Sequence, residues 1–250
     1  MITRARPVRL AAALFRFMAD DVVRNRRLYL AGALGGYSLF ELGTAVAMQG
    51  GSAEGFGSRF ILVALIVSAP LCRPWLGEDV RLGFAALWLQ KPLGVLEYYL
   101  ARILAAVAWS VVATLAIGIA SLPASIGVVA VIDIARTVVA LGWIPTTLAV
   151  LSFLGSALGA RNSGLFAYAA LFAGFALPGF RDAMWLGPLY RVLEVVLPPA
   201  YSALQANVAW RDGNVMAAAA ELRPLLVYLL ICTGLALSLA VQVPKRLARA

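Results

Sequence analysis

The sequence predicts an all-α polytopic membrane protein with six transmembrane helices. The chain of 250 residues is 62% hydrophobic and only 13% charged, and its mean hydropathy is +0.88. Its charges gather at the ends of long apolar segments. A soluble domain of this length cannot bury so much apolar surface, so lipid is the expected solvent. We therefore expect a single transmembrane domain over residues 1–250.

Residues 1–27 have the pattern of a cytoplasmic amphipathic helix at the membrane interface. Leu14 and Met18 fall on one helical face, and Arg16 and Arg27 fall on the opposite one. Such a helix lies in the headgroup region with its arginines toward anionic lipid. The alternative is a solvated arginine-rich tail. The apolar run before Arg16 is too short for a signal peptide.

Six apolar segments follow, each judged against the roughly 20 residues needed to cross the bilayer. The expected spans are 28–48, 60–76, 98–122, 134–158, 164–180 and 224–243. Pro145 and Pro178 are expected to bend the fourth and fifth spans. Gly155 and Gly159 have the four-residue spacing of helices that approach closely in lipid.

The distribution of basic residues sets the topology. Fifteen of the 21 lysines and arginines fall in one set of loops, and the other six fall on the opposite side. The loops of the first set are 1–27, 73–102, 159–163 and 244–250. By the positive-inside rule both termini and the loop 77–97 are cytoplasmic, and the tail 244–250 with them.

The external side has one substantial segment, residues 181–223. It carries Trp185, Tyr190 and other aromatic residues that favour the membrane interface. Leu186 to Leu197 is expected to form a short helix that ends at Pro198-Pro199. The alternative is a long interfacial loop without such a helix.

The stretch from Trp75 to Arg102 is a long polar interruption that still has an apolar face. Leu82, Ala86 and Leu89 recur at helical spacing between charged residues. Pro92 ends this helix because proline lacks the amide donor. A second helix is expected to start at about Val95 and to run directly into the third span.

This stretch resembles the loop between the second and third spans of ABC type-2 permeases, the membrane subunits of ABC exporters. The matching residues are Glu78, Gly83, Leu87-Trp88-Leu89, Lys91-Pro92, Glu97 and Arg102. Phe84 stands where the family usually has Thr. The six-span layout is similar as well, and many of these permeases have an external helical hairpin between the fifth and sixth spans.

The resemblance implies that residues 77–97 are a cytoplasmic coupling helix that docks on a separate ABC ATP-binding subunit. The residues expected to pack into or contact that subunit are Glu78, Arg81, Leu82, Phe84, Leu87, Trp88 and Lys91. It also implies a second permease copy, as a homodimer, and export across a bacterial inner membrane. The alternative is a membrane-parallel helix that only anchors its loop.

Glu41 is the ionisable residue that lies deepest in the first span. A carboxylate there is costly unless it faces a polar cavity, finds a partner or is protonated. We therefore expect Glu41 either to line a transport pathway or to contact a second permease copy. The alternative is that it lies near the external interface.

Residues that are missing from the sequence exclude several functions. The chain contains no histidine, and neither Lys91 nor Lys245 ends a P-loop motif. We expect no catalytic site, no metal site and no nucleic-acid binding, with ATP and Mg bound by the partner subunit. The alternatives are an ion-coupled secondary transporter and a non-transporting membrane scaffold or assembly factor.

Overall fold

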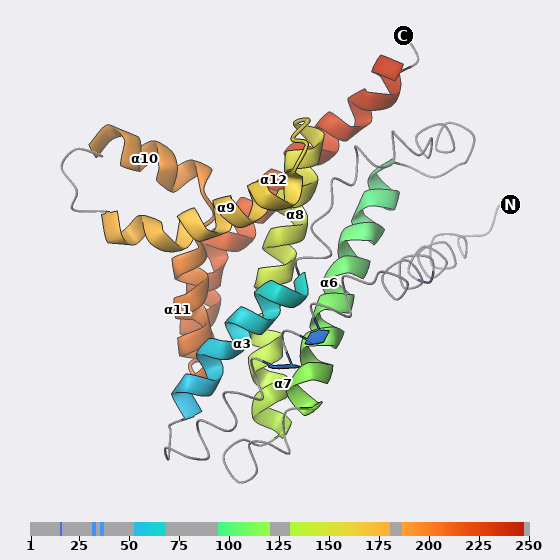
Figure 1. The fold of residues 1–250 in the computed structure, drawn as a ribbon. Coiled ribbons are helices and arrows are strands. Elements are labelled where there is room, and N and C mark those ends of the chain that lie inside the picture. The colour runs from blue at the N-terminus through green and yellow to red at the C-terminus, as the bar shows by residue number, and fades with distance from the viewer. Residues whose placement is uncertain are drawn as a thin grey trace, which may run out of the picture. The chain divides into compact units, whose positions relative to one another are not determined.

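The computed structural model describes residue 16 and residues 32–33, 36–37, 53–68, 95–120, 131–180 and 187–247 (Figure 1). Within these ranges the backbone is helical, with short turns and no strand. The chain divides into two compact units. One comprises Met1–Leu71 with Gln90–Thr146, and the other comprises Cys72–Leu89 with Thr147–Ala250.

Four helical segments are long and apolar enough to cross a membrane. They are Glu97–Ala120, Arg136–Ala157, Ser163–Phe180 and Val215–Gln242. They coincide with the third to sixth predicted spans, so the prediction of a helical, membrane-embedded protein is confirmed. The predicted count of six spans remains a prediction.

At the first two predicted spans, the residues that the structure describes include no such segment. Most of the first, residues 28–48, lies outside the described residues. At the second, residues 60–76, the structure has helix α3 (Ala53–Ser68). This helix begins seven residues earlier than predicted, and residues 69–76 of the predicted span lie outside the described residues.

In the first unit, α6 (Val95–Ala120) packs against both α3 and α7 (Val131–Ala140). The buried face of α6 repeats every three or four residues and becomes smaller and more polar along the helix. Its members are Tyr99, Ile103, Ala106, Ser110 and Thr114. The Thr114 hydroxyl donates to the Ser110 carbonyl oxygen at 2.7 Å, so this polar group is satisfied within its own helix.

The fourth predicted span contains a break between α7 and α8 (Trp143–Ala157). Pro145 has no amide hydrogen to donate to the Leu141 carbonyl, four residues earlier. That carbonyl accepts instead from the Ile144 amide at 2.9 Å. The Thr146 hydroxyl also donates to the Gly142 carbonyl at 2.8 Å. The bend predicted at Pro145 is therefore a local turn at Leu141-Gly142.

A tight turn joins α8, most of which belongs to the second unit, to α9 (Ser163–Ala176). The turn follows a Schellman motif, in which Gly159 has a positive φ of 86°. The Gly159 amide donates to the Ser156 carbonyl at 3.1 Å, and the Ala160 amide donates to the Gly155 carbonyl at 2.8 Å. Glycine is needed at 159 for backbone conformation, not for helix packing.

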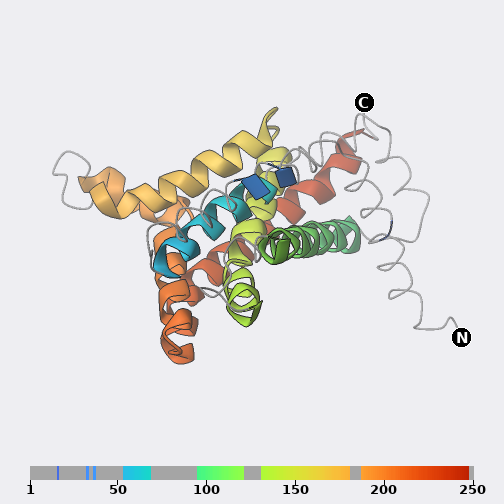
Figure 2. The same ribbon diagram turned by 60° about the horizontal axis from the view of Figure 1, so that its bottom comes forward.

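The chain then continues through η3 (Leu177–Phe180), α10 (Gly187–Val196) and α11 (Ala200–Arg211). The predicted bend at Pro178 takes the form of the 3-10 turn η3. The helix predicted over Leu186 to Leu197 is present as α10, and Pro198-Pro199 follows it. Figures 1 and 2 show α10 returning beside η3, which it contacts.

α11 and α12 (Val215–Leu247) form a helical hairpin, visible in both views (Figures 1 and 2). Gly213, with φ of 77°, makes another Schellman turn. The Asn214 carboxamide oxygen accepts from the Ala217 amide at 3.0 Å and so caps α12. The sixth predicted span begins at Pro224, but the helix begins nine residues earlier, at Val215, because this cap starts it there.

Large apolar side chains of the candidate spans are exposed. Exposed residues include Leu104 on α6, Phe172 on α9, and Leu226 and Leu230 on α12. Exposed apolar surface on several long helices is typical of a chain solvated by lipid.

Candidate functional site

The residues predicted to couple this chain to an ATPase lie outside the described residues. They are Glu78, Arg81, Leu82, Phe84, Leu87, Trp88 and Lys91, and Glu41 lies outside as well. Their roles remain predictions. The described part of the stretch from Trp75 to Arg102 is its last eight residues, which belong to α6.

α6 begins at Val95, the residue at which the sequence predicts a new helix, and it is unbroken to Ala120. Glu97 lies in its first turn, where the helix dipole favours a negative charge. The helix therefore joins the end of the predicted coupling loop to the far end of a candidate span as one rigid element of about 39 Å.

Arg102 anchors the beginning of α6. It is only 9% exposed. Its Nη1 atom donates to the Tyr98 hydroxyl at 3.4 Å, and its guanidinium carbon lies 5.9 Å from the centre of the Tyr98 ring. Tyr98 in turn meets Tyr99 edge to face, with ring centres 5.1 Å apart, and Tyr99 is fully buried. These contacts fix the position of Arg102, the basic residue at the beginning of the third span.

The sequence analysis did not identify Tyr98 and Tyr99 as partners of Arg102. Their spacing contained a usable signal, because residues four apart lie on the same helical face, and arginine binds readily over an aromatic ring. We interpret the cluster as a structural anchor. It fixes the first two turns of α6 in the first unit.

The buried polar side chains of the described residues are short hydroxyls, apart from Arg102. They are Ser68, Ser110, Thr114, Thr147, Ser152, Ser156 and Ser163. The Ser152 and Ser163 hydroxyl oxygens lie 3.3 Å apart, linking α8 to α9. Among the side chains that the structure describes, no carboxylate is buried, and among the described residues no group of three or more His, Cys, Asp or Glu side chains is placed to hold a metal ion.

Glycine allows close helix contacts at one of the two positions that the sequence analysis selected in the fourth span. A Cβ atom at Gly155 would lie 2.9 Å from Cδ1 of Phe166 and 3.4 Å from Cβ of Ser163. At Gly159 nothing lies within 4 Å, so the packing role predicted for this residue is wrong.

A second close approach, at Gly174, was not predicted. A Cβ atom there would collide with the Pro198 carbonyl oxygen. The Tyr228 hydroxyl donates to the neighbouring Val196 carbonyl at 2.9 Å. The end of α10 is therefore held from two sides, by α9 and by α12. No sequence pattern pairs these residues, since Tyr228 and Val196 are 32 residues apart.

Comparison of this chain with protein-family models, curated proteins and solved structures finds no match.

Proposed function

We propose that this chain is the permease subunit of an ATP-binding-cassette exporter, similar to ABC type-2 permeases. The single observation that carries the proposal is the stretch from Trp75 to Arg102, in which an amphipathic polar loop leads into a membrane helix on the side predicted to be cytoplasmic. The continuous α6 helix, which begins inside this stretch at Val95, supports it.

In the proposed mechanism, ATP hydrolysed by a partner subunit moves the loop from Glu78 to Lys91. Closure of the nucleotide-binding pair would push on this loop, and α6 would transmit the displacement because a helix resists bending along its length. Tilting of the second and third spans would then open a cavity between two permease copies toward the outside. Leu82, Phe84, Leu87 and Trp88 would pack into the ATPase.

The substrate class follows from the polarity of the described spans. Their buried polar groups are mostly hydroxyls, with Arg102 near one helix end, so they suit a lipid, a hydrophobic peptide or another amphipathic molecule better than a polyanion. An ion-coupled transporter would be expected to have ionisable groups inside its spans, and among the side chains that the structure describes no carboxylate is buried. This pattern favours a transporter driven from outside the chain.

The test is purification of the full-length tagged protein from its native membrane in mild detergent, followed by mass spectrometry and an ATPase assay. We expect a stoichiometric P-loop ATPase to copurify. Combining Glu78→Lys, Arg81→Glu and Trp88→Ala should remove the ATPase from the preparation.

The matched control combines Glu221→Lys, Arg223→Glu and Trp210→Ala. It makes the same chemical changes at exposed residues of α11 and α12, on the side predicted to be external. This control should keep the ATPase. Recovery of the chain alone, or equal loss of ATPase in both variants, would contradict the proposal and favour a scaffold or an ion-coupled transporter.

A further inference from the structure

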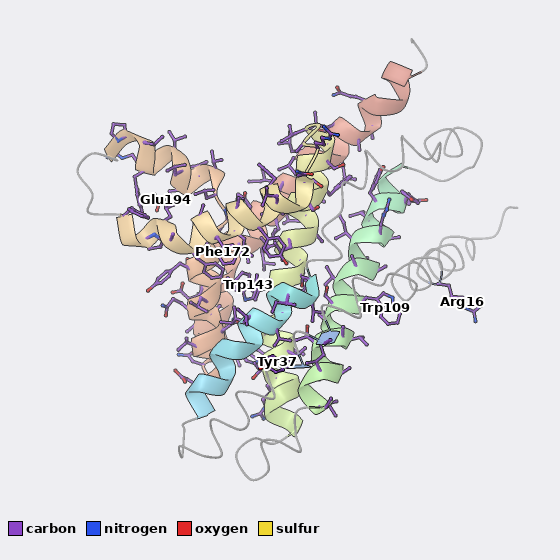
Figure 3. The ribbon with its side chains drawn as sticks, in the orientation of Figure 1. Arg16, Tyr37, Trp109, Trp143, Phe172 and Glu194 are labelled. Atoms are coloured by element: carbon purple, nitrogen blue, oxygen red, sulfur yellow. The ribbon has the colours of Figure 1, made fainter. Side chains whose placement is uncertain are left out.

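One buried hydroxyl in α6 makes no hydrogen bond to the described part of the chain. Ser110 is 1% exposed, and no described atom bonds its Oγ. The neighbouring Trp109, labelled in Figure 3, marks the level of this hydroxyl along α6. A buried hydroxyl without a hydrogen bond is costly, and nearly all such groups in native proteins have a partner. Ser110 therefore needs an explanation.

Ser110 differs in this respect from other buried hydroxyls on the described helices. The Ser68 hydroxyl donates to the Ala64 carbonyl at 2.6 Å. The Thr114 hydroxyl donates to the Ser110 carbonyl at 2.7 Å. Both use the carbonyl four residues earlier, which is the usual partner of serine or threonine inside a helix. The Ser110 hydroxyl does not use the corresponding carbonyl of Ala106, so its partner must come from outside the helix.

The depth of Ser110 excludes bulk solvent as this partner. The candidate span Glu97–Ala120 has 24 residues, and Ser110 lies about 20 Å from its beginning and about 15 Å from its end. This position is close to the middle of the span, where bulk water and lipid headgroups do not reach. The partner of the hydroxyl must therefore be held inside the protein.

The face of α6 that carries Ser110 is the one buried in the first unit, where α6 packs against α3 and α7. Its side chains become smaller toward the middle of the span, from Ile103 to Ala106 and Ser110, which leaves more room beside the helix. Thr114 lies one turn further on the same face and is 3% exposed. Its hydroxyl hydrogen is used on the Ser110 carbonyl, but its oxygen can still accept.

We propose that Ser110 and Thr114 bind a water molecule in the first unit, at the middle of the membrane. The Ser110 hydroxyl donates to the water oxygen, and the water donates to the Thr114 hydroxyl oxygen. Residues four apart on a helix have Cβ atoms about 5–6 Å apart, a gap that one water can bridge. An ion would be a poor occupant, because charge is costly at this depth and both side chains are neutral. This inference does not depend on the proposed transport function.

The first test is water-edited solid-state NMR of the full-length protein in vesicles of phosphatidylcholine and phosphatidylglycerol. The protein is labelled with ¹³C-serine and ¹³C-threonine, and Ser110→Ala and Thr114→Val assign the two signals. Ser152 is the reference for a buried hydroxyl bonded to protein, since it is fully buried and its oxygen lies 3.3 Å from that of Ser163. Ser152 is also nearer to the end of its span than Ser110 is, so depth alone favours the reference.

We expect magnetisation from water to reach the Cβ atoms of Ser110 and Thr114 several-fold faster than the Cβ atom of Ser152. Transfer to Ser110 at the Ser152 rate, or more slowly, would overturn the proposal, because no water would then contact this hydroxyl. Fast transfer to Ser110 with slow transfer to Thr114 would overturn the role of Thr114 as the second partner.

Thermal unfolding gives a second readout, in which the two possibilities have opposite signs. Ser110→Ala should lower Tm by a few degrees if the hydroxyl bonds a water, whereas removal of an unpaired hydroxyl should raise Tm. An unchanged or higher Tm would overturn the proposal. Ser238→Ala is the matched control, because this exposed hydroxyl donates to the Leu235 carbonyl of its own helix at 2.7 Å, and it should change Tm little.

The double variant tests whether one water links the two hydroxyls. The losses in Tm from Ser110→Ala and Thr114→Val should be non-additive, because either substitution removes one end of the bridge. Additive losses would overturn the bridge. Size-exclusion chromatography and circular dichroism establish that each variant is folded before measurement.

Discussion

Replacing Gly174 by alanine should destabilise this protein, although alanine is the better helix former. Gly174 lies within α9, where alanine is intrinsically more favourable than glycine by about 1 kcal/mol. The added methyl group, however, would collide with the carbonyl oxygen of Pro198. Because that oxygen is backbone, relief requires movement of the whole Pro198-Pro199 corner.

The size of the effect follows from these two opposing terms. Overpacking costs about 1–3 kcal/mol, and a backbone obstacle places this case at the upper end. Subtracting the helix preference leaves a net loss of about 2 kcal/mol. For a chain of this length such a loss lowers Tm by about 4–8 °C. Thermal unfolding in detergent, followed by circular dichroism, measures it.

Two other glycines provide matched controls for the same substitution. At Gly234 on α12 nothing lies within 4 Å of the new methyl group, so alanine should be neutral or stabilising. At Gly155 the nearest atom, at 2.9 Å, belongs to the ring of Phe166, a partly exposed side chain that can shift. Tm should therefore rank Gly234→Ala above Gly155→Ala above Gly174→Ala. A Gly174→Ala protein as stable as Gly234→Ala would refute the close approach.

Three further sets of substitutions test other contacts in the second unit, each by thermal unfolding. Asn214→Ala should lose about 1 kcal/mol because it removes the cap of α12, and Asn214→Ser should restore most of it. Gly213→Ala should lose about 1–2 kcal/mol because its positive φ disfavours a side chain, and Gly159→Ala should behave alike; unchanged stability in either would contradict the Schellman turn. Ser152→Ala and Ser163→Ala should each lose about 0.6 kcal/mol and be non-additive in the double variant, whereas additive losses would show that the two hydroxyls are not paired.

The third to sixth spans could be predicted because each is a long apolar run, and lipid imposes that length. A helix that runs unbroken from Val95 into the third span was predicted as well. An interruption of the fourth span was predicted from Pro145, and the structure has it as the turn at Leu141-Gly142. In these places the local sequence determines the backbone conformation, and no distant residue is needed.

Features that depend on contacts between distant residues were not predicted. The early start of α12 is set by a side-chain cap at Asn214, although the apolar run that indicates a span begins only near Pro224. The contacts of Gly174 with Pro198 and of Tyr228 with Val196 arise from folding back of α10, which no periodicity records. Of the residues that carry the family resemblance, only Glu97 and Arg102 fall in the described residues. The predicted coupling residues lie outside them, so their role remains a prediction.

The length of α12 has a consequence for how the protein fits its bilayer. Its candidate span of 28 residues is about 42 Å long, whereas the hydrocarbon is about 30 Å thick. Tilting alone would need about 45°, more than the 0–40° that membrane helices adopt. Part of α12 must therefore project from the membrane, and the exposed charges of Glu221 and Arg223 identify its beginning as that part. The start of α12 at Val215 then stands about 14 Å beyond Pro224. Bilayers a few ångströms thicker or thinner should change the height of this projection, not the register of the helices packed below it.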